Sequence, residues 1–179
     1  FAARGGAVAA ADIDGDRASK VAKQISANGG RAVAIETDVS RRKDIEAMVA
    51  CTARAFGRLD ALHNNAYGVP ASLPRGNSAR LVDMPEDRWD HALRVGLTAV
   101  LQARQLAIPI MRGQGGGAIV NTASIAGLAA DPGTAAYNAV KAAVINLTRD
   151  GGERSSSAGA ATRRRRSPLS ARPRAGRRR

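Results

Sequence analysis

The chain has 179 residues, 44% of them apolar and 24% charged, which is ordinary usage for one globular domain. Its one cysteine, Cys51, excludes an intrachain disulfide and suits a reducing, cytoplasmic location; with only two histidines beside it, we predict no metal site. The net charge of +13 is strongly basic, but no apolar run is long enough to cross a bilayer, so we predict no membrane partner.

Strand and helix signals alternate through the first 150 residues, as in a doubly wound parallel sheet of the α/β class. Apolar runs predict four strands, at residues 7–12, 32–36, 59–63 and 118–123. Helical spacing predicts helices that end at 28–30, at Gly57 and at Gly113, and a last helix around Tyr137. We expect Ser40 to cap the second helix and Pro85 to open the third, after a polar loop at 68–80.

Tyr137 and Lys141 stand four residues apart in the last helix, so their side chains project from one face, one turn apart. An ammonium group beside a phenol stabilises the phenolate, which suits the tyrosine to acid and base catalysis near neutral pH. Ser124, thirteen residues upstream, ends the preceding strand, where its hydroxyl could help to hold a carbonyl oxygen. The alternative is an ordinary helix in which the lysine is solvated and the tyrosine half-buried.

With Ser124, the turn Asp131-Pro132-Gly133 and the Tyr137 helix, the segment 117–150 resembles the short-chain dehydrogenase/reductases. The resemblance implies an NAD(P)-dependent oxidoreductase with a Rossmann-like fold that interconverts a secondary alcohol and a ketone, both small molecules. Tyr137 would exchange a proton with the substrate, Lys141 would bind the nicotinamide ribose, and Ser124 would fix the substrate oxygen. The resemblance further implies a homo-oligomer that pairs through the long helix and the Tyr137 helix.

Asp12 ends the first strand, at the sheet edge where open α/β sheets bind ligands. Its carboxylate could accept hydrogen bonds from both hydroxyls of an adenosine ribose. The next residue is Ile13, and no arginine stands there to meet a ribose phosphate, so the pattern favours NAD over NADP. The alternative is a carboxylate that only flanks the following helix.

Other cofactor contacts are implied by the resemblance. Asp38 and Val39 resemble the pair that borders the adenine, and Asn64-Asn65-Ala66 resembles the start of the family signature Asn-Asn-Ala-Gly, so Asn65 and Ala66 are candidate cofactor residues along with Tyr137 and Lys141. Two positions depart from the family.

Tyr67 stands where the signature has its glycine, and its side chain could crowd the turn. Gly96 stands where the family has an asparagine that helps to hold a water-mediated proton path to the lysine. Glycine has no polar side chain, so we expect impaired proton relay.

The two ends of the chain also depart from the family. Residues 1–5 resemble the end of the helix that follows a glycine-rich phosphate loop, so we expect an incomplete sheet that lacks its first strand. This loss should either leave an unpaired gap between 7–12 and 59–63 or force these two strands together. Residues 151–179 hold ten arginines and one glutamate, a net charge of +9 against +4 for residues 1–150. We therefore predict a partial NAD(P)-binding domain at 1–150, without the family's C-terminal strands, and a disordered Arg-rich tail at 151–179.

The abrupt change of composition at Gly151 favours a shifted reading frame in GC-rich coding DNA. On this hypothesis the chain is an inactive fragment of the enzyme. The alternative is a non-catalytic chain whose tail binds nucleic acid or acidic partners without sequence preference, through runs such as Arg163–Arg166.

Overall fold

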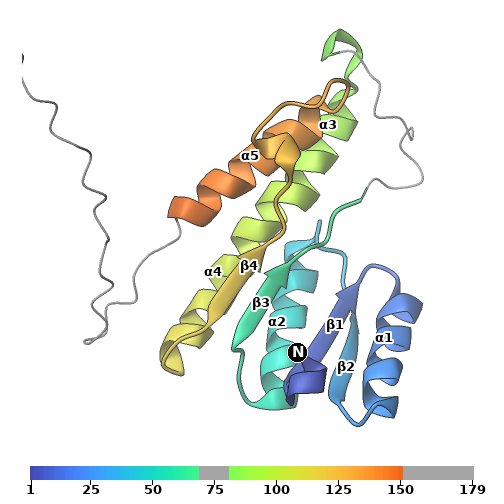
Figure 1. Ribbon diagram of the computed structural model, residues 1–179, viewed down its shortest axis with the longest axis vertical. Coiled ribbons are helices and arrows are strands. Elements are labelled where there is room, and N and C mark those ends of the chain that lie inside the picture. Colours follow the sequence, from blue (N-terminus) through green and yellow to red (C-terminus); the bar gives the residue numbers. More distant parts are fainter. Residues whose placement is uncertain (69–80, 151–179) are drawn as a thin grey trace, which may run out of the picture.

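The computed structural model describes residues 1–68 and 81–150 (Figure 1), and the predictions made for 69–80 and 151–179 lie outside these residues. The described part has the predicted α/β fold, with parallel strands and helices in alternation. A short 3-10 turn, η1 (Ala2–Arg4), opens it and ends at Gly5 with a left-handed φ of 81°, as expected for the end of a helix.

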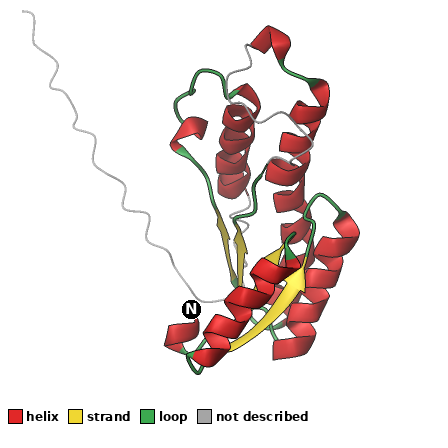
Figure 2. Cartoon of the chain, turned by 90° about the vertical axis from the view of Figure 1, so that its right-hand side faces the viewer, coloured by secondary structure: helices red, strands yellow, loops and turns green. Residues whose placement is uncertain are grey.

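The first strand pair is a parallel βαβ unit made of β1 (Ala7–Asp12), α1 (Gly15–Ala27) and β2 (Arg31–Glu36). The pairing runs from Ala7 opposite Arg31 to Asp12 opposite Glu36, so both strands end in carboxylates at the same edge. Helix α1 covers one face of this pair, and α2 (Arg42–Phe56) lies on the other (Figure 2). The strand predicted at 7–12, the helix predicted to end at 28–30 and the strand predicted at 32–36 are therefore confirmed.

The second strand pair joins β3 (Ala61–Asn64) to β4 (Ala118–Asn121), also in parallel. Between them runs one long helix in three parts: α3 (Glu86–Leu93), the π-helical turn η3 (Arg94–Thr98) and α4 (Ala99–Gly113), after the short η2 (Leu81–Asp83). The chain then passes through η4 (Ile125–Gly127) into α5 (Ala135–Asp150). β3 begins two residues later than predicted and β4 ends two residues earlier.

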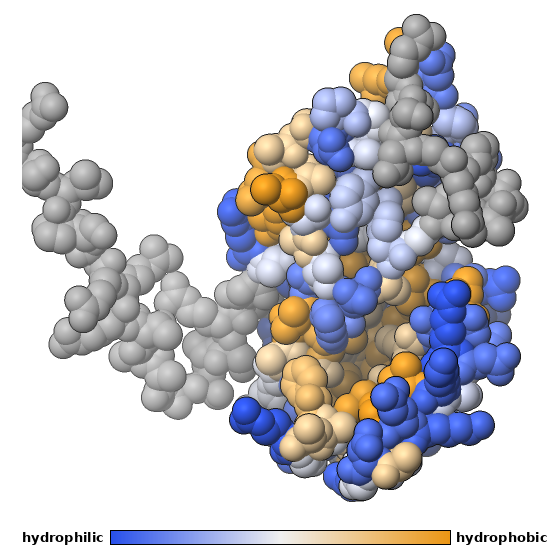
Figure 3. Space-filling view, turned by 45° about the vertical axis from the view of Figure 1, so that its right-hand side comes forward, coloured by the Kyte–Doolittle hydropathy of each residue, from blue (hydrophilic) through white to orange (hydrophobic). Residues whose placement is uncertain are grey.

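The two strand pairs are separate sheets, since the described residues form no hydrogen-bonded ladder between β1 and β3. The predicted gap between these strands is therefore confirmed. On the face drawn in Figure 3, apolar side chains are visible in a recess between the two halves of the molecule.

Two clusters of buried apolar side chains form the core of the described residues. One lies between α2, α4 and β3 and is built on Ile45, Val49, Leu62 and Ala107; the other lies between the long helix and α5 and is built on Val100, Val140 and Val144. Among the described residues, no helix is long and apolar enough to span a membrane, and no three His, Cys, Asp or Glu side chains gather as a metal site would require.

The predicted cap of α2 was wrong. Arg41 occupies the N-cap position without a capping side chain, while the N–H of Ser40 donates to the Asp38 carboxylate at 2.9 Å. The Asp38 side chain therefore closes a turn on the residue that we expected to cap the helix, and this turn delays the helix start. Gly57 ends the helix at a φ of 75°, as predicted.

Candidate active site

Helix α5 holds Tyr137 and Lys141 one turn apart, with Lys141 buried at 5% exposure. The Lys141 Nζ donates a hydrogen bond of 2.6 Å to the backbone carbonyl of Thr122, just beyond β4. A buried ammonium needs such a partner, because its desolvation would otherwise be costly. The alternative of a solvated lysine is therefore wrong, and the spacing in sequence does place both groups at one site.

Ser124 follows β4 and caps the short turn η4, where its Oγ accepts from the Ala126 N–H at 3.2 Å. This turn lies directly on α5, because a Cβ added at Gly127 would stand 2.6 Å from the backbone carbon of Lys141. Only glycine allows such a close approach of two backbones. The packing thus holds the segment that carries Ser124 against the helix that carries Tyr137.

The ends of β3 and β4 are joined by side-chain hydrogen bonds. The Thr122 hydroxyl donates to Asn65 Oδ1 at 2.9 Å, and Asn64 Nδ2 donates to Asn121 Oδ1 at 2.8 Å. Thr122 therefore connects the Asn64-Asn65-Ala66 segment to Lys141: its hydroxyl donates to Asn65, and its carbonyl accepts from Lys141. The sequence analysis did not assign Thr122 to the site. The only feature of the sequence that could have indicated it is its position two residues before Ser124.

Tyr67 is the second residue that the sequence did not assign to the site. Its ring meets the Tyr137 ring edge-on, with centroids 5.0 Å apart and planes at 66°. The Lys141 Nζ lies 5.3 Å from the Tyr67 centroid and 5.6 Å from the Tyr137 centroid, within reach of a cation–π attraction to each. Burial raises the pKa of Tyr67, and the neighbouring Tyr137 phenol adds to this effect.

A cavity of about 220 Å³ opens beside the two tyrosines. Its walls come from the segment after β3, from α3 and the residues just before it, from the loop before α5 and from α5 itself, and they combine aromatic, apolar and charged side chains. The lining residues are Tyr67, Met84, Arg88, His91, Ala92, Asp131, Gly133, Thr134, Ala136 and Tyr137. A small polar molecule that enters here would reach Tyr137.

The candidate cofactor carboxylates lie at the edge of the other sheet. Asp12 Oδ1 accepts from the Asp14 N–H at 2.9 Å, while Asp14 caps α1 by accepting from the N–H groups of Asp16 and Arg17. The capping role that was the alternative for Asp12 thus belongs to Asp14. In the described part of the chain, the Asp12 carboxylate receives no second hydrogen bond, which leaves it free to accept from a ligand.

Asp38 and Val39 follow β2 at the same edge. Burial alone would raise the pKa of Asp38, but the hydrogen bonds from Ser40 and the charges of Arg41 and His91 outweigh it and lower that pKa. Val39 packs partly buried against the cluster of Ile45 and Val49. Asn65 and Ala66 are exposed beyond β3.

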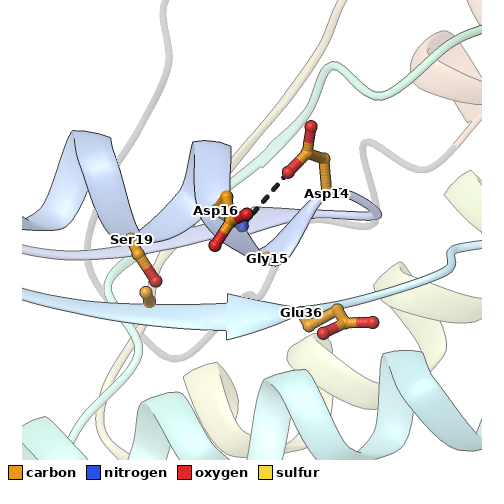
Figure 4. A pocket seen from close by; sticks show the side chains of 6 residues that line it. Asp14, Gly15, Asp16, Ser19 and Glu36 are labelled. Atoms are coloured by element: carbon orange, nitrogen blue, oxygen red, sulfur yellow. Dashed lines mark hydrogen bonds between the residues drawn. The ribbon is translucent and has the colours of Figure 1, made fainter.

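An open hollow of about 420 Å³ lies between the start of α1 and β2 (Figure 4). Its lining residues are Asp14, Gly15, Asp16, Ser19, Ala34 and Glu36, so three carboxylates face it. A phosphate would be repelled here. The hollow adds to the negative charge of the sheet edge that carries Asp12.

Parallel strands that end in polar groups at one sheet edge, followed by a helix that carries a tyrosine and a buried lysine, are typical of the dinucleotide-binding class of α/β domains. A sequence model of the short chain dehydrogenase family matches residues 1–159, and the chain belongs to this family.

Curated relatives and solved structures agree with this assignment. The chain is 36% identical over 145 residues to a 7alpha-hydroxysteroid dehydrogenase of Bacteroides fragilis, covering 81% of this chain and 54% of the relative. It is 34% identical over 149 residues to the 3-oxoacyl-[acyl-carrier-protein] reductase FabG of Thermotoga maritima, covering 83% and 58%. The chain thus spans little more than half the length of these relatives.

Two solved structures carry a cofactor in their descriptions. An NAD+-bound xylitol dehydrogenase superposes with a TM-score of 0.73 at 30% identity, over 80% of this chain and 53% of the other. A 7 alpha-hydroxysteroid dehydrogenase complexed with NADH and 7-oxo glycochenodeoxycholic acid superposes with a TM-score of 0.75 at 29% identity, over 84% and 56%.

Proposed function

We propose that the protein is an NAD-dependent oxidoreductase that interconverts a secondary alcohol and a ketone. The observation that carries this proposal is the burial of Lys141, fixed to the carbonyl of Thr122 one helical turn from Tyr137. An ammonium group buried beside a phenol is a costly arrangement, and acid and base catalysis by the phenol gives it a use.

Each residue of the site then has a defined task. Tyr137 donates its phenol proton to the ketone oxygen, or removes the proton of the alcohol in the reverse direction. Lys141 stabilises the phenolate, and because only one of its three N–H groups is used by Thr122, it can also donate to a ribose hydroxyl. Ser124 holds the substrate oxygen. The nicotinamide, when bound, supplies or accepts the hydride.

The residues of the first sheet fit NAD better than NADP. Asp12 retains a carboxylate oxygen for ribose hydroxyls, whereas the added phosphate of NADP would meet Asp12 and the nearby charges of Asp14 and Asp16. Asp38 and Val39 would border the adenine, and Asn65 and Ala66 the remainder of the cofactor. The NAD+ and NADH in the two structural neighbours support this preference.

We further propose that this chain by itself does not turn over. No backbone ladder joins β1 to β3 in the described residues, so the spacing between Asp12 and Tyr137 is not fixed by a continuous sheet. Gly96 offers no polar side chain for a proton path to Lys141. A small-molecule substrate, a cytoplasmic location and a homo-oligomer that pairs through α4 and α5 remain parts of the proposal.

Cofactor binding tests the proposal without requiring turnover. Trp89 is the only tryptophan, so energy transfer from its indole to the reduced nicotinamide reports the binding of NADH and NADPH. We expect NADH to bind more tightly than NADPH. Asp12→Asn should weaken NADH about tenfold, because hydrogen bonds to a charged group contribute about 1.5–3 kcal/mol. The ratio of the affinities for NADH and NADPH should also be smaller in Asp12→Asn than in the parent chain.

Asp16→Asn is the matched control for the affinity of NADH, since it removes a neighbouring exposed carboxylate to which the proposal assigns no hydrogen bond with the ribose. Equal affinities for NADH in Asp12→Asn and the parent chain, or tighter binding of NADPH, would overturn the cofactor assignment. NADH oxidation should be absent with steroid, 3-oxoacyl and sugar ketones. Turnover that Tyr137→Phe abolishes would refute the proposed inactivity, and turnover that survives Tyr137→Phe would refute the assignment of Tyr137.

A further inference from the structure

Tyr67 lies between the long helix and α5, where it contacts both groups assigned to proton transfer. The Tyr67 ring stands edge-on to the Tyr137 ring, with 5.0 Å between the two centroids. The Lys141 Nζ lies 5.3 Å from the centroid of the Tyr67 ring. The Lys141 Nζ therefore lies near both phenol rings and has the Thr122 carbonyl as its hydrogen-bond acceptor. The contacts fix Tyr67 relative to the reactive pair and not merely to the surrounding core.

The space for this ring is created by Gly96 within the π-helical turn η3. A Cβ added at Gly96 would stand 3.0 Å from Cε2 of Tyr67 and 2.5 Å from Cγ1 of Val140. The distance to Val140 is too short for a Cβ and the distance to Tyr67 is tight, so a side chain at position 96 would force Val140 and the Tyr67 ring to shift. Widened π turns often occur at functional sites, and this one brings the helix backbone against Tyr67.

The two departures from the family are thus one structural exchange. A bulky ring at position 67 occupies the room that a missing side chain at position 96 leaves open. Burial raises the pKa of Tyr67, so its phenol stays protonated and neutral beside Lys141 at neutral pH. A neutral ring can attract the ammonium through its face without competing for it as a second anion.

We propose that Tyr67 is a positioning residue for the reaction, whose ring, seated on Gly96, holds the Tyr137 ring and the Lys141 ammonium in their relative orientation. This role rests on the proposed function only in its consequence for catalysis, because the positioning itself is a property of the chain. The ring does the positioning, and the hydroxyl is dispensable for it.

Nuclear magnetic resonance tests the positioning directly, since Tyr67 and Tyr137 are the only tyrosines. With labelled tyrosine, Tyr67→Leu and Tyr67→Phe each leave Tyr137 as the single ring signal. We expect Tyr67→Leu to shift the Tyr137 ring protons and the Lys141 ε-methylene protons and to weaken the nuclear Overhauser contacts between these two groups, because the ring that holds them in their relative orientation is lost. Tyr67→Phe should keep both sets of signals near their positions in the parent chain.

Leu147→Ala controls for a general loss of packing, because it removes apolar volume from the same cluster farther along α5. Gly96→Ala is a second variant that should displace the Tyr67 ring and move the same signals. Unchanged Tyr137 and Lys141 signals in Tyr67→Leu, or equal shifts in Tyr67→Phe and Tyr67→Leu, would overturn the proposal.

The NADH titration separates failure of this role from failure of the proposed function. If NADH does not bind but the resonances behave as expected, the positioning stands and the dehydrogenase assignment falls. If NADH binds but the resonances do not respond to Tyr67→Leu, the assignment stands and Tyr67 has no positioning role.

Discussion

The two strand pairs of this molecule are held by different means. In the β1–α1–β2 unit, the buried apolar side chains are the small Ala18 and Ala22, and the strands themselves are only partly covered. The β3–β4 pair belongs to a part of the chain where Ile45, Val140 and Val144 are fully buried. Large side chains are therefore fully buried around the second pair, whereas the first unit buries only small ones.

This difference teaches which part of the site is preorganised. Lys141 and Tyr137 lie on a helix whose inner face is packed, so their orientation is fixed before any ligand arrives. Asp12 lies on a thinly covered sheet that no ladder joins to the other in the described residues. The core therefore sets the orientation of the proposed catalytic groups, whereas the position of the proposed cofactor carboxylate depends on local turns.

The largest expected effect comes from comparing the same substitution, isoleucine to alanine, at one position in each region. Ile45→Ala empties a fully buried site in α2 and should lower the free energy of unfolding by about 3 kcal/mol. Ile35→Ala, on the partly covered β2, should cost only about 1 kcal/mol. Urea unfolding followed by circular dichroism measures both values.

Intrinsic preferences work against the expected order, which sharpens this comparison. Alanine is favoured over isoleucine in the helix that carries Ile45 and disfavoured in the strand that carries Ile35. Equal losses, or a larger loss for Ile35→Ala, would show that the first unit is packed as firmly as the second.

Gly127→Ala tests the contact that holds Ser124 against α5. The added Cβ would stand 2.6–2.8 Å from backbone atoms of Lys141 and Ala142, which cannot rotate away. We expect a loss of about 2 kcal/mol in unfolding free energy, as for overpacked cores. Gly113→Ala is the control, because nothing lies within 4 Å of its added Cβ. A Gly127→Ala chain as stable as the control would contradict the close approach.

Sequence patterns predicted most elements because those signals are local. Apolar spacing placed α1, α2 and α5, and glycines with left-handed φ marked their neighbouring turns at Gly29 and Gly57. The π turn η3 left no such signal, since Trp89, Leu93, Leu97 and Leu101 recur every four residues and fit a straight helix. The turn goes with the close packing of Gly96 on Tyr67 and Val140, which only the tertiary structure contains.

In the candidate site too, the residues with local sequence signals were predicted and those defined by tertiary contacts were not. The spacing of Ser124, Tyr137 and Lys141 placed all three at the end of β4 and on α5. Thr122 and Tyr67 escaped because their contacts depend on the register of β3 with β4 and on the path of the segment after β3.

The smallest effects concern two groups whose pKa values move in opposite directions, although burial alone would raise both. For Tyr67, in the packed part, burial prevails and the pKa is raised; for Asp38, in the open part, Ser40, Arg41 and His91 prevail over burial and the pKa is lowered. A raised phenol pKa gives stability that is present below the unfolded pKa of about 10 and is lost as the pH rises through the folded value. A lowered carboxyl pKa gives stability that is present above about pH 4 and is lost as the pH falls through the folded value.

Stability measured against pH should therefore decline at both ends for separable reasons. Tyr67→Phe should flatten the decline above about pH 10 and leave the acid side unchanged. Asp38→Asn should flatten the decline below about pH 4 and leave the alkaline side unchanged. If Asp38→Asn left the acid decline intact, the turn around Ser40 would not be what lowers the carboxyl pKa. If Tyr67→Phe left the alkaline decline intact, burial would not be what raises the pKa of Tyr67. The Tyr67 ring would then be more open to water than its place between Gly96 and Tyr137 allows. The two pKa values would no longer support the contrast between a packed and an open part of the molecule.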